Sequence, residues 1–265
     1  MEYERVKIEF EKDFAVLTLN HPEALNAVSL QMIRELNRVL DPIEDPANGA
    51  RCLLISGAGR GFCAGANLSD PEKNMGGEGA IDLGDGLEKW YNPFFIRLRD
   101  LRMPIITAVN GPAAGVGMSL ALMGDIVLAA RSAFFLQAFR RIGLIPDGGA
   151  TYILPRMIGL ARAMELSLLG ERLPAETALE WGLINRIYED DQLMPAALKL
   201  AAELAGGPTE ALRLIRKAYW KSIDNTYEEQ LKLERTLQRQ AGRTSDFREG
   251  VSAFLEKRSA RFKGK

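Results

Sequence analysis

Two glycine-rich loops, each directly after an apolar segment, give the first indication of chemistry in this sequence. The loop of residues 57–69 (GAGRGFCAGANLS) follows the apolar residues 51–56, and the loop of residues 110–117 (NGPAAGVG) follows residues 105–109. A glycine turn between a strand and a helix exposes unpaired amide N–H groups, which bind a phosphate or stabilise an oxyanion. Neither loop has the G-x-x-x-x-G-K-S/T pattern of a nucleotide-phosphate cradle. Each loop alone could be only a tight turn, but the pair favours an oxyanion hole.

One acidic residue, Asp147, lies in the segment IGLIPDGGA of residues 142–150. Burial of its carboxyl group would raise its pKa and suit it to a proton shuttle. The apolar neighbours that could bury it are Ile142, Leu144 and Ile145. The alternative is that Asp147 only caps a helix that begins at Gly149. Asp125, which precedes another predicted strand, is expected to be structural.

Composition excludes several other classes of function. A formal net charge of −1 over 265 residues argues against binding of nucleic acid or anionic membranes through bulk electrostatics. Cys52 and Cys63, with His21 as the single histidine, supply neither the ligands of a zinc site nor a thiol nucleophile with an adjacent base. We therefore expect no metal site. No apolar run has the length of a signal peptide or a membrane span, which predicts a cytoplasmic protein.

Strands and helices alternate over residues 1–190, and helices fill residues 191–265 almost alone. Alternating and apolar runs predict a hairpin over residues 6–19 and further strands at residues 51–56, 104–109, 126–130, 134–138 and 185–188. This order predicts a fold of the α/β class, with a core over residues 1–190 and a helical C-terminal region over residues 191–265.

Two predicted helices lie close to the loops in the chain. Ser29 has the residue type of an N-cap and precedes an apolar stripe of helical period, which we expect Pro42 and Pro46 to end. Residues 87–102 have a helical pattern that Pro93 should start or kink.

Five segments, in order, resemble the crotonase (enoyl-CoA hydratase/isomerase) superfamily: FCAGANLSD, AVNGPAAGVGMSLALMGDIVLAA, GLIPDGGA, EWGLI and EGVSAFLEKR. The resemblance covers essentially the whole chain. It implies a crotonase-like spiral of β-β-α units, a helical C-terminal trimerisation region, and a homotrimer or a dimer of trimers. It also implies an acyl-CoA thioester as substrate, whose carbonyl oxygen accepts hydrogen bonds from the amides of Ala66 and Val116. Further substrate-binding residues implied by the resemblance are Ala64, Asn67, Leu68, Gly115, Ser119 and Phe139, with Lys257 at a coenzyme A phosphate.

Two departures from the superfamily pattern narrow the chemistry. Hydratases of the superfamily have glutamates at the positions of Ser119 and Phe139, and this pair holds and activates water. Without the pair we do not expect hydration, and Asp147 remains as the acid/base group, as in some isomerases of the superfamily. Dehalogenases of the superfamily also need a histidine after the first loop, where this sequence has none.

The segments GAGRGFCAG, WYNP, GLIPDGG and AGR…REGVSAFL most resemble a branch that isomerises a ring epoxide in phenylacetate catabolism. That resemblance implies conversion of 1,2-epoxyphenylacetyl-CoA to an oxepin-CoA, and a shift of a 3-enoyl-CoA double bond to the 2-position. It implies no cofactor beyond the coenzyme A of the substrate. The alternatives are a hydratase, another acyl-CoA enzyme of hydrolase or dehalogenase type, and a non-catalytic RNA-binding member of the superfamily.

Two stretches keep alternative interpretations. Trp90, Tyr91, Phe94 and Phe95 either line an aryl pocket or form the buried face of a helix. Residues 70–86, which are acidic and rich in glycine, are either a cover over the site or a tolerated surface insertion.

Overall fold

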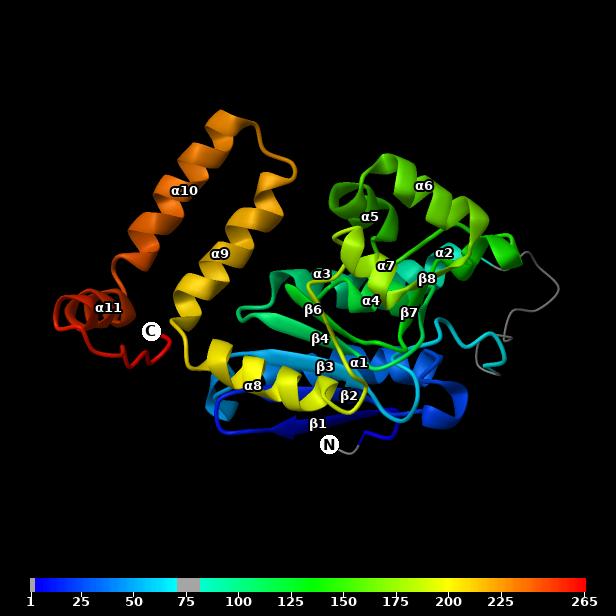
Figure 1. Cartoon of the computed structure of the whole chain (residues 1–265), viewed down its shortest axis with the longest axis horizontal. Helices are drawn as coiled ribbons and strands as arrows, with labels where there is room; N and C mark the ends of the chain where they lie inside the picture. Colours follow the sequence, from blue (N-terminus) through cyan, green and yellow to red (C-terminus); the bar gives the residue numbers. More distant parts are fainter. Residues whose placement is uncertain (1–2, 71–81) are drawn as a thin grey trace.

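The computed structural model describes residues 3–70 and 82–265, so most of the acidic, glycine-rich stretch lies outside the described residues. Two sheets and their helices form a core, and a helical arm extends from one side of it (Figure 1). The strands are β1 (Val6–Phe10), β2 (Ala15–Leu19), β3 (Leu53–Gly57), β4 (Ile105–Val109), β5 (Ala113–Ala114), β6 (Ile126–Ala130), β7 (Phe134–Leu136), β8 (Arg172–Pro174) and β9 (Arg186–Tyr188). The α-helices are α1 (Leu30–Glu44), α2 (Leu83–Gly86), α3 (Asn92–Asp100), α4 (Val116–Ala121), α5 (Ala150–Ile158), α6 (Leu160–Leu169), α7 (Ala175–Glu180), α8 (Leu193–Ala205), α9 (Thr209–Ser222), α10 (Tyr227–Ala241) and α11 (Ser245–Leu255).

The larger sheet has the strand order β1-β2-β3-β4-β6-β9. Strands β1 and β2 form the predicted antiparallel hairpin, with Val6 opposite Leu19, and all other pairs are parallel. Every residue of β4 is buried, as expected for a parallel strand covered on both faces. Because β3 and β4 are parallel neighbours, both glycine loops leave the sheet at the same edge.

Two strands of the smaller sheet, β5 and β7, directly follow members of the larger one, and its third strand, β8, follows α6. Its order is β5-β7-β8, with Ala113 of β5 opposite Phe135 of β7 in a parallel pair. The units β4-β5-α4 and β6-β7-α5 thus each place one strand in each sheet before the chain enters a helix. The predicted α/β class, with β-β-α units followed by C-terminal helices, is confirmed.

Helices cover both faces of the larger sheet. Helix α8 packs against β3, β4 and β6, while α1 and α3 pack on each other behind the sheet in the view of Figure 1. Ser29 caps α1 as predicted, since its hydroxyl accepts from the amide of Met32 at 3.0 Å. The prediction that Pro42 ends this helix was wrong: Pro42 lies inside α1, which continues to Glu44 because the proline removes only one main-chain hydrogen bond while Leu40 and Ile43 beside it stay packed in the core.

Helices α9 and α10 form an antiparallel pair that extends from the core as an arm, and α11 lies across the end of the pair at which α9 begins (Figure 1). Arg216 of α9 anchors the arm: its Nε donates to Asp125 at 2.5 Å, and its other nitrogens donate to the carbonyls of Leu98 and Leu101. Asp125 therefore has a structural role. The division at residue 190 and the trimerisation role of the arm remain predictions. No helix in residues 3–70 and 82–265 is both long and apolar enough to cross a membrane.

Candidate active site

The two glycine loops touch each other at Gly65 and Gly115. Gly65 has φ +100° and Gly115 has φ +53°, in the region of backbone conformation that favours glycine. A Cβ atom on Gly65 would lie 3.0 Å from the carbonyl oxygen of Ala114 and 3.8 Å from the Cα atom of Gly115. The loops approach this closely because both positions lack side chains, and the approach puts Ala66 and Val116 at the same junction.

The amide of Ala66 points away from the pairing that holds its loop. Val28 and Ala66 form a parallel bridge, in which the Val28 amide donates to Gly65 (2.7 Å) and the Asn67 amide donates to Val28 (2.9 Å). Successive residues of an extended segment direct their N–H groups to opposite sides, so the Ala66 N–H faces away from Val28. Within the described part of the chain it donates to no main-chain oxygen.

The amide of Val116 is the first of α4. The Gly115 amide is used by the carbonyl of Leu136 (2.8 Å), and the Ser119 amide donates to the Gly115 carbonyl (3.2 Å). The first amides of a helix have no intrahelical acceptor, and none of the described main-chain oxygens accepts from Val116. Ala66 and Val116 thus offer two N–H donors at one junction, an arrangement that suits an oxyanion hole.

Ser119 and Gly148 hold the main chain of Asp147 against α4. Ser119 is fully buried, and its hydroxyl donates to the carbonyl oxygen of Asp147 at 2.8 Å. Gly148 has φ +59°, and a Cβ atom there would lie 2.8 Å from the Cβ of Ser119 and 2.9 Å from the Cζ of Phe95. Asp147 is therefore fixed through its backbone, with its Oδ1 atom enclosed by protein. The amide of Ala150, at the start of α5, also donates to the main-chain oxygen of Asp147 (3.1 Å).

The expectation that the apolar residues next to Asp147 in the sequence bury its carboxyl group was wrong. The loop turns Ile142, Leu144 and Ile145 outward, with exposed fractions of 50%, 39% and 81%. The enclosure comes instead from residues far away in the sequence. Tyr91 is buried and lies close enough to Asp147 for that negative charge to raise its pKa.

The sequence left open whether the aromatic residues before and within α3 line an aryl pocket or form the buried face of a helix, and the structure divides them. Tyr91 and Phe95 face the loop that carries Asp147, whereas Phe94 is 1% exposed and belongs to the core. The guanidinium carbon of Arg34 lies over the Trp90 ring, 5.0 Å from the centroid of that ring. Pro93 is the second residue of α3, and a π-helical turn of Leu87–Tyr91 precedes it, so the predicted start or kink is confirmed. The sequence marked this cluster through WYNP but did not separate its members.

The second hydratase position also carries no carboxylate. Phe139 is buried, and its ring would lie 3.7 Å from a Cβ atom on Gly115. The hydroxyl at the first position, that of Ser119, already donates to Asp147. Neither side chain is a carboxylate, and Asp147 is an acidic residue held next to the loop junction.

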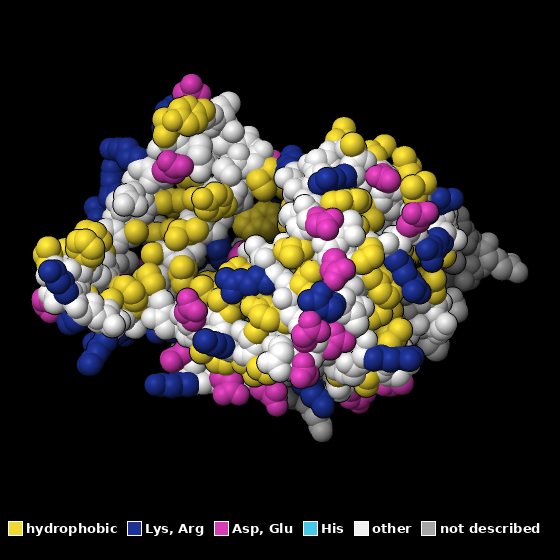
Figure 2. Space-filling model, in the orientation of Figure 1, with side chains coloured by type: hydrophobic (Ala, Val, Ile, Leu, Met, Phe, Trp, Pro, Cys, Tyr) yellow, Lys and Arg dark blue, Asp and Glu magenta, His cyan; other side chains and the backbone are white. Residues whose placement is uncertain are grey.

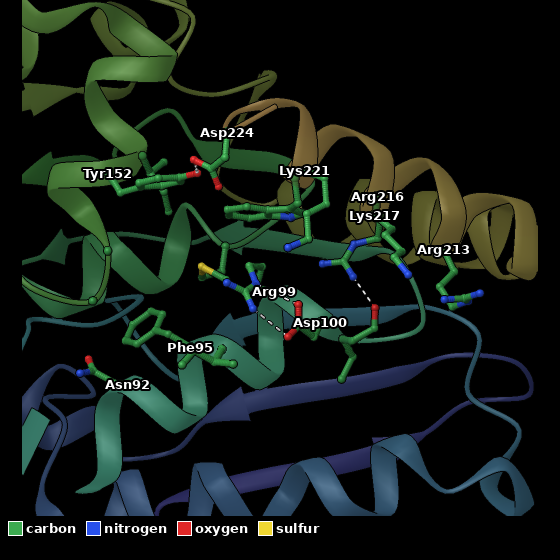
Figure 3. A pocket seen from close by; sticks show the side chains of 17 residues that line it. Asn92, Phe95, Arg99, Asp100, Tyr152, Arg213, Arg216, Lys217, Lys221 and Asp224 are labelled. Atoms are coloured by element: carbon green, nitrogen blue, oxygen red, sulfur yellow. Dashed lines mark hydrogen bonds and ion pairs between the residues drawn. The ribbon is translucent and has the colours of Figure 1, made fainter. Parts of the chain in front are cut away.

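A cleft of about 690 Å³ between α3, α5 and α9 shares Phe95, Gly148 and Gly149 with this site. Figure 2 shows the hollow between the arm and the part of the molecule that carries α5 and α6, with hydrophobic side chains at its floor. In Figure 3, Lys217 and Lys221 extend from α9 toward the cleft. The cleft thus lies beside the loop that carries Asp147, and its arm side is positively charged.

Pairs of side chains border the same cleft. Arg99 donates to Asp100 through two nitrogens, both at 2.8 Å, on the α3 side. At the opposite edge, the hydroxyl of Tyr152 on α5 donates to Asp224, which follows α9, at 2.8 Å (Figure 3). This bond joins the core to the arm across the cleft.

A second cavity, of about 380 Å³, is lined by residues of both glycine loops. Ala64 and Ala114 line it, together with Arg60 and with Arg172, whose guanidinium lies 4.5 Å from the centroid of the Phe134 ring. Almost all of the surface that faces this cavity is apolar.

The remaining sequence-predicted residues lie at different distances from the junction. The Oδ1 of Asn67 accepts from the amide of Ser69 at 3.0 Å, and Leu68 is 62% exposed. Lys257 follows α11 on the arm, and Figure 1 shows that end of the arm well away from the loops of the same chain. Its predicted phosphate contact thus requires a neighbouring subunit. Among the residues that the structure describes, no three His, Cys, Asp or Glu side chains are grouped to hold a metal ion.

The sequence profile described as enoyl-CoA hydratase/isomerase matches residues 9–265. The chain belongs to the enoyl-CoA hydratase/isomerase family. Over 255 residues it is 52% identical to the 1,2-epoxyphenylacetyl-CoA isomerase of Escherichia coli strain K12, which covers 96% of this chain and 97% of that protein. It is 41% identical over 265 residues, the whole of both chains, to a probable enoyl-CoA hydratase of Rhodobacter capsulatus.

Solved structures show the same fold. The enoyl-CoA hydratase subunit I of Geobacillus kaustophilus HTA426 superposes with a TM-score of 0.90 at 34% identity, covering 100% of both chains. The resemblance drawn from the five sequence segments is confirmed, and the chain is a crotonase-family enzyme that acts on an acyl-CoA. The named relatives include isomerases and hydratases, so family membership leaves the type of reaction open.

Proposed function

We propose that this enzyme is an acyl-CoA isomerase that needs no cofactor beyond the coenzyme A of its substrate. The observation that carries the proposal is the combination at the loop junction: two available amides beside a fixed Asp147, with Ser119 and Phe139 where a hydratase needs glutamates. The substrate's thioester oxygen accepts hydrogen bonds from Ala66 and Val116.

The shift of a double bond from the 3- to the 2-position follows from this arrangement. Asp147 removes the proton from the carbon α to the thioester and returns it to the γ carbon, so the carboxylate is regenerated in each turnover. Between the two transfers the negative charge lies on the thioester oxygen, where the two amides stabilise it. Loss of one such donor typically costs about 3 kcal/mol of transition-state stabilisation.

The second reaction we propose is conversion of 1,2-epoxyphenylacetyl-CoA to the oxepin-CoA. Its support is the 52% identity to the Escherichia coli protein of that name, together with the aromatic residues Tyr91 and Phe95 beside Asp147. This rearrangement involves no net proton transfer. The two roles open to Asp147 are to orient the ring and to protonate the oxygen.

The test is the variant Asp147→Asn, assayed with an aryl-epoxide acyl-CoA and a straight-chain 3-enoyl-CoA. We expect an unchanged thermal transition and loss of the double-bond shift, because an amide cannot carry the proton. A wild-type rate of isomerisation in this variant would refute the assignment of Asp147.

A hydratase is the second candidate, because the Rhodobacter capsulatus relative is named a probable enoyl-CoA hydratase. Incubation of the wild-type enzyme with crotonyl-CoA and mass spectrometry of the product separates the two proposals. Hydration adds the mass of one water, whereas isomerisation leaves the mass unchanged.

A further inference from the structure

Two asparagines that the proposed mechanism does not use, Asn26 and Asn110, meet at one carbonyl oxygen of the first glycine loop. The side-chain amide of Asn26 donates to the carbonyl of Gly61 at 2.8 Å, and the side-chain amide of Asn110 donates to the same oxygen at 3.4 Å. Asn26 lies between β2 and α1, whereas Asn110 directly follows β4. One oxygen of the first loop thus connects that loop to two segments that are distant in the sequence.

Asn26 is a fully buried residue with three side-chain hydrogen bonds. Besides the bond to Gly61, its Nδ2 atom donates to the carbonyl of Ala58 at 2.9 Å, and its Oδ1 atom accepts from the amide of His21 at 2.8 Å. Its φ is +57°, a left-handed conformation that asparagine adopts more readily than most residues. Gly57 makes room for the side chain, because a Cβ atom there would lie 2.8 Å from the Nδ2 atom of Asn26. Both N–H groups of this amide are therefore used to hold the first loop.

The main chain on either side of Asn26 runs beside the segment that carries the Ala66 amide. The carbonyl of Leu25 accepts from the amide of Ala64 at 2.9 Å. Val28 pairs with both sequence neighbours of Ala66 through the parallel bridge described above. Asn26 therefore anchors the segment on which the direction of the Ala66 N–H depends.

Asn110 joins the second glycine loop to the first. Besides the bond to Gly61, its Nδ2 atom donates to the carbonyl of Gly59 at 2.9 Å, and its Oδ1 atom accepts from the amide of Gly57 at 3.2 Å. The next residue, Gly111, lies directly against the first loop, since a Cβ atom there would lie 2.3 Å from the carbonyl oxygen of Arg60. The second loop is thus fixed to the first at the point where it leaves β4.

Resting on the isomerase function proposed above, we propose that Asn26 and Asn110 are positioning residues for the oxyanion hole, which act through the carbonyl of Gly61. The two N–H donors, those of Ala66 and Val116, belong to different loops, so their separation depends on how the loops lie relative to each other. Donors stabilise an oxyanion best when they are fixed before the charge develops. The two asparagines link both loops and the segment before α1, and so restrain the two donors relative to each other.

The experiment measures how much acetoacetyl-CoA is bound as its enolate, by ultraviolet absorbance, in the wild type, Asn26→Gly and Asn110→Ala. This ligand loses a proton to the solvent from the carbon between its two carbonyl groups, and the negative charge then lies partly on the thioester oxygen. The enolate fraction therefore reports on the N–H donors without any double-bond shift. Glycine adopts the left-handed conformation of residue 26 without strain, and neither variant adds a charge.

We expect the ratio of enolate to keto form in the bound ligand to fall about tenfold or more in each variant, because loss of one oxyanion donor costs roughly 100-fold or more. The kcat for a 3-enoyl-CoA should fall by a similar factor. KM should change less than about threefold, because the charge on the oxygen develops only in the transition state.

The matched control is Asn37→Ala on α1. The side-chain amide of Asn37 also donates to two main-chain oxygens, those of Ile33 (2.8 Å) and Trp90 (3.0 Å), but to neither glycine loop. This variant should lower the thermal midpoint and keep the wild-type enolate fraction.

An unchanged enolate fraction and kcat in Asn26→Gly and Asn110→Ala would show that the asparagines only stabilise the fold, and would overturn the proposal. An equal loss of enolate in Asn37→Ala would overturn it as well. Asn110 is only half-buried, so Asn110→Ala decides the question even where Asn26→Gly does not fold. A wild-type protein that binds the enolate but does not isomerise a 3-enoyl-CoA would refute the proposed function alone.

Discussion

Replacing Gly148 with alanine tests whether the main chain of Asp147 is held as the structure shows. Gly148 has φ +59°, a left-handed conformation that costs an alanine about 1–2 kcal/mol. The new Cβ would lie 2.8 Å from the Cβ of Ser119 and 2.9 Å from the Phe95 ring, and such overpacking costs about a further 1–3 kcal/mol. The matched control is Gly143→Ala, because Gly143 has φ +72° and open space around a Cβ atom. It carries the backbone cost without the clash.

The assay is the thermal midpoint of both variants together with their kcat for a 3-enoyl-CoA. At roughly 2–4 °C per kcal/mol for a chain of this size, the clash should lower the midpoint of Gly148→Ala by a further ~2–12 °C relative to Gly143→Ala. Relief of the clash moves Asp147, and a displacement of ~1 Å in a catalytic group can cost ~100-fold in rate. Equal midpoints in the two variants, with wild-type kcat in Gly148→Ala, would refute this account of the clamp.

Three further predictions concern other parts of the molecule. Ser119→Glu alone should not produce hydration of crotonyl-CoA, because the second carboxylate is still missing and the position is fully buried; a hydrated product in mass spectrometry would contradict this. Burial raises the pKa of the thiols of Cys52 and Cys63 to about 12, so in the native protein at pH 8 both should react with a thiol reagent only after unfolding, and rapid labelling would show that they are accessible. Arg216→Met should destabilise the protein by about 3 kcal/mol because it leaves Asp125 without its cation, and a thermal midpoint unchanged from the wild type would show that this pair does not anchor the arm.

Local patterns in the sequence predicted most of the elements correctly. The hairpin of β1 and β2, the buried strands β3 and β4, and the cap at Ser29 depend on neighbouring residues only, so periodicity and residue type were sufficient. The prediction that Pro42 ends α1 failed because burial of Leu40 and Ile43 outweighs the one main-chain hydrogen bond that the proline removes, and such burial is decided by tertiary packing.

The environment of Asp147 could not be predicted from its neighbours in the sequence. Ile142, Leu144 and Ile145 suggested burial, but a loop between two helical segments can turn such residues outward, and this one does. Nothing in the local sequence connects Tyr91 to this carboxylate. The two residues lie near each other because the helical segment that contains Tyr91 packs beside the loop that contains Asp147.

The sequence by itself determined the family, the two glycine loops and the absence of glutamates at positions 119 and 139, because each of these depends on which residue occupies a position. The tertiary structure decided what those residues form together. Contact of Gly65 with Gly115 requires β3 and β4 to be parallel neighbours, since only then do both loops leave the same edge of the sheet. The enclosure of Asp147 likewise depends on packing between distant segments, and local preferences carry no information about such contacts.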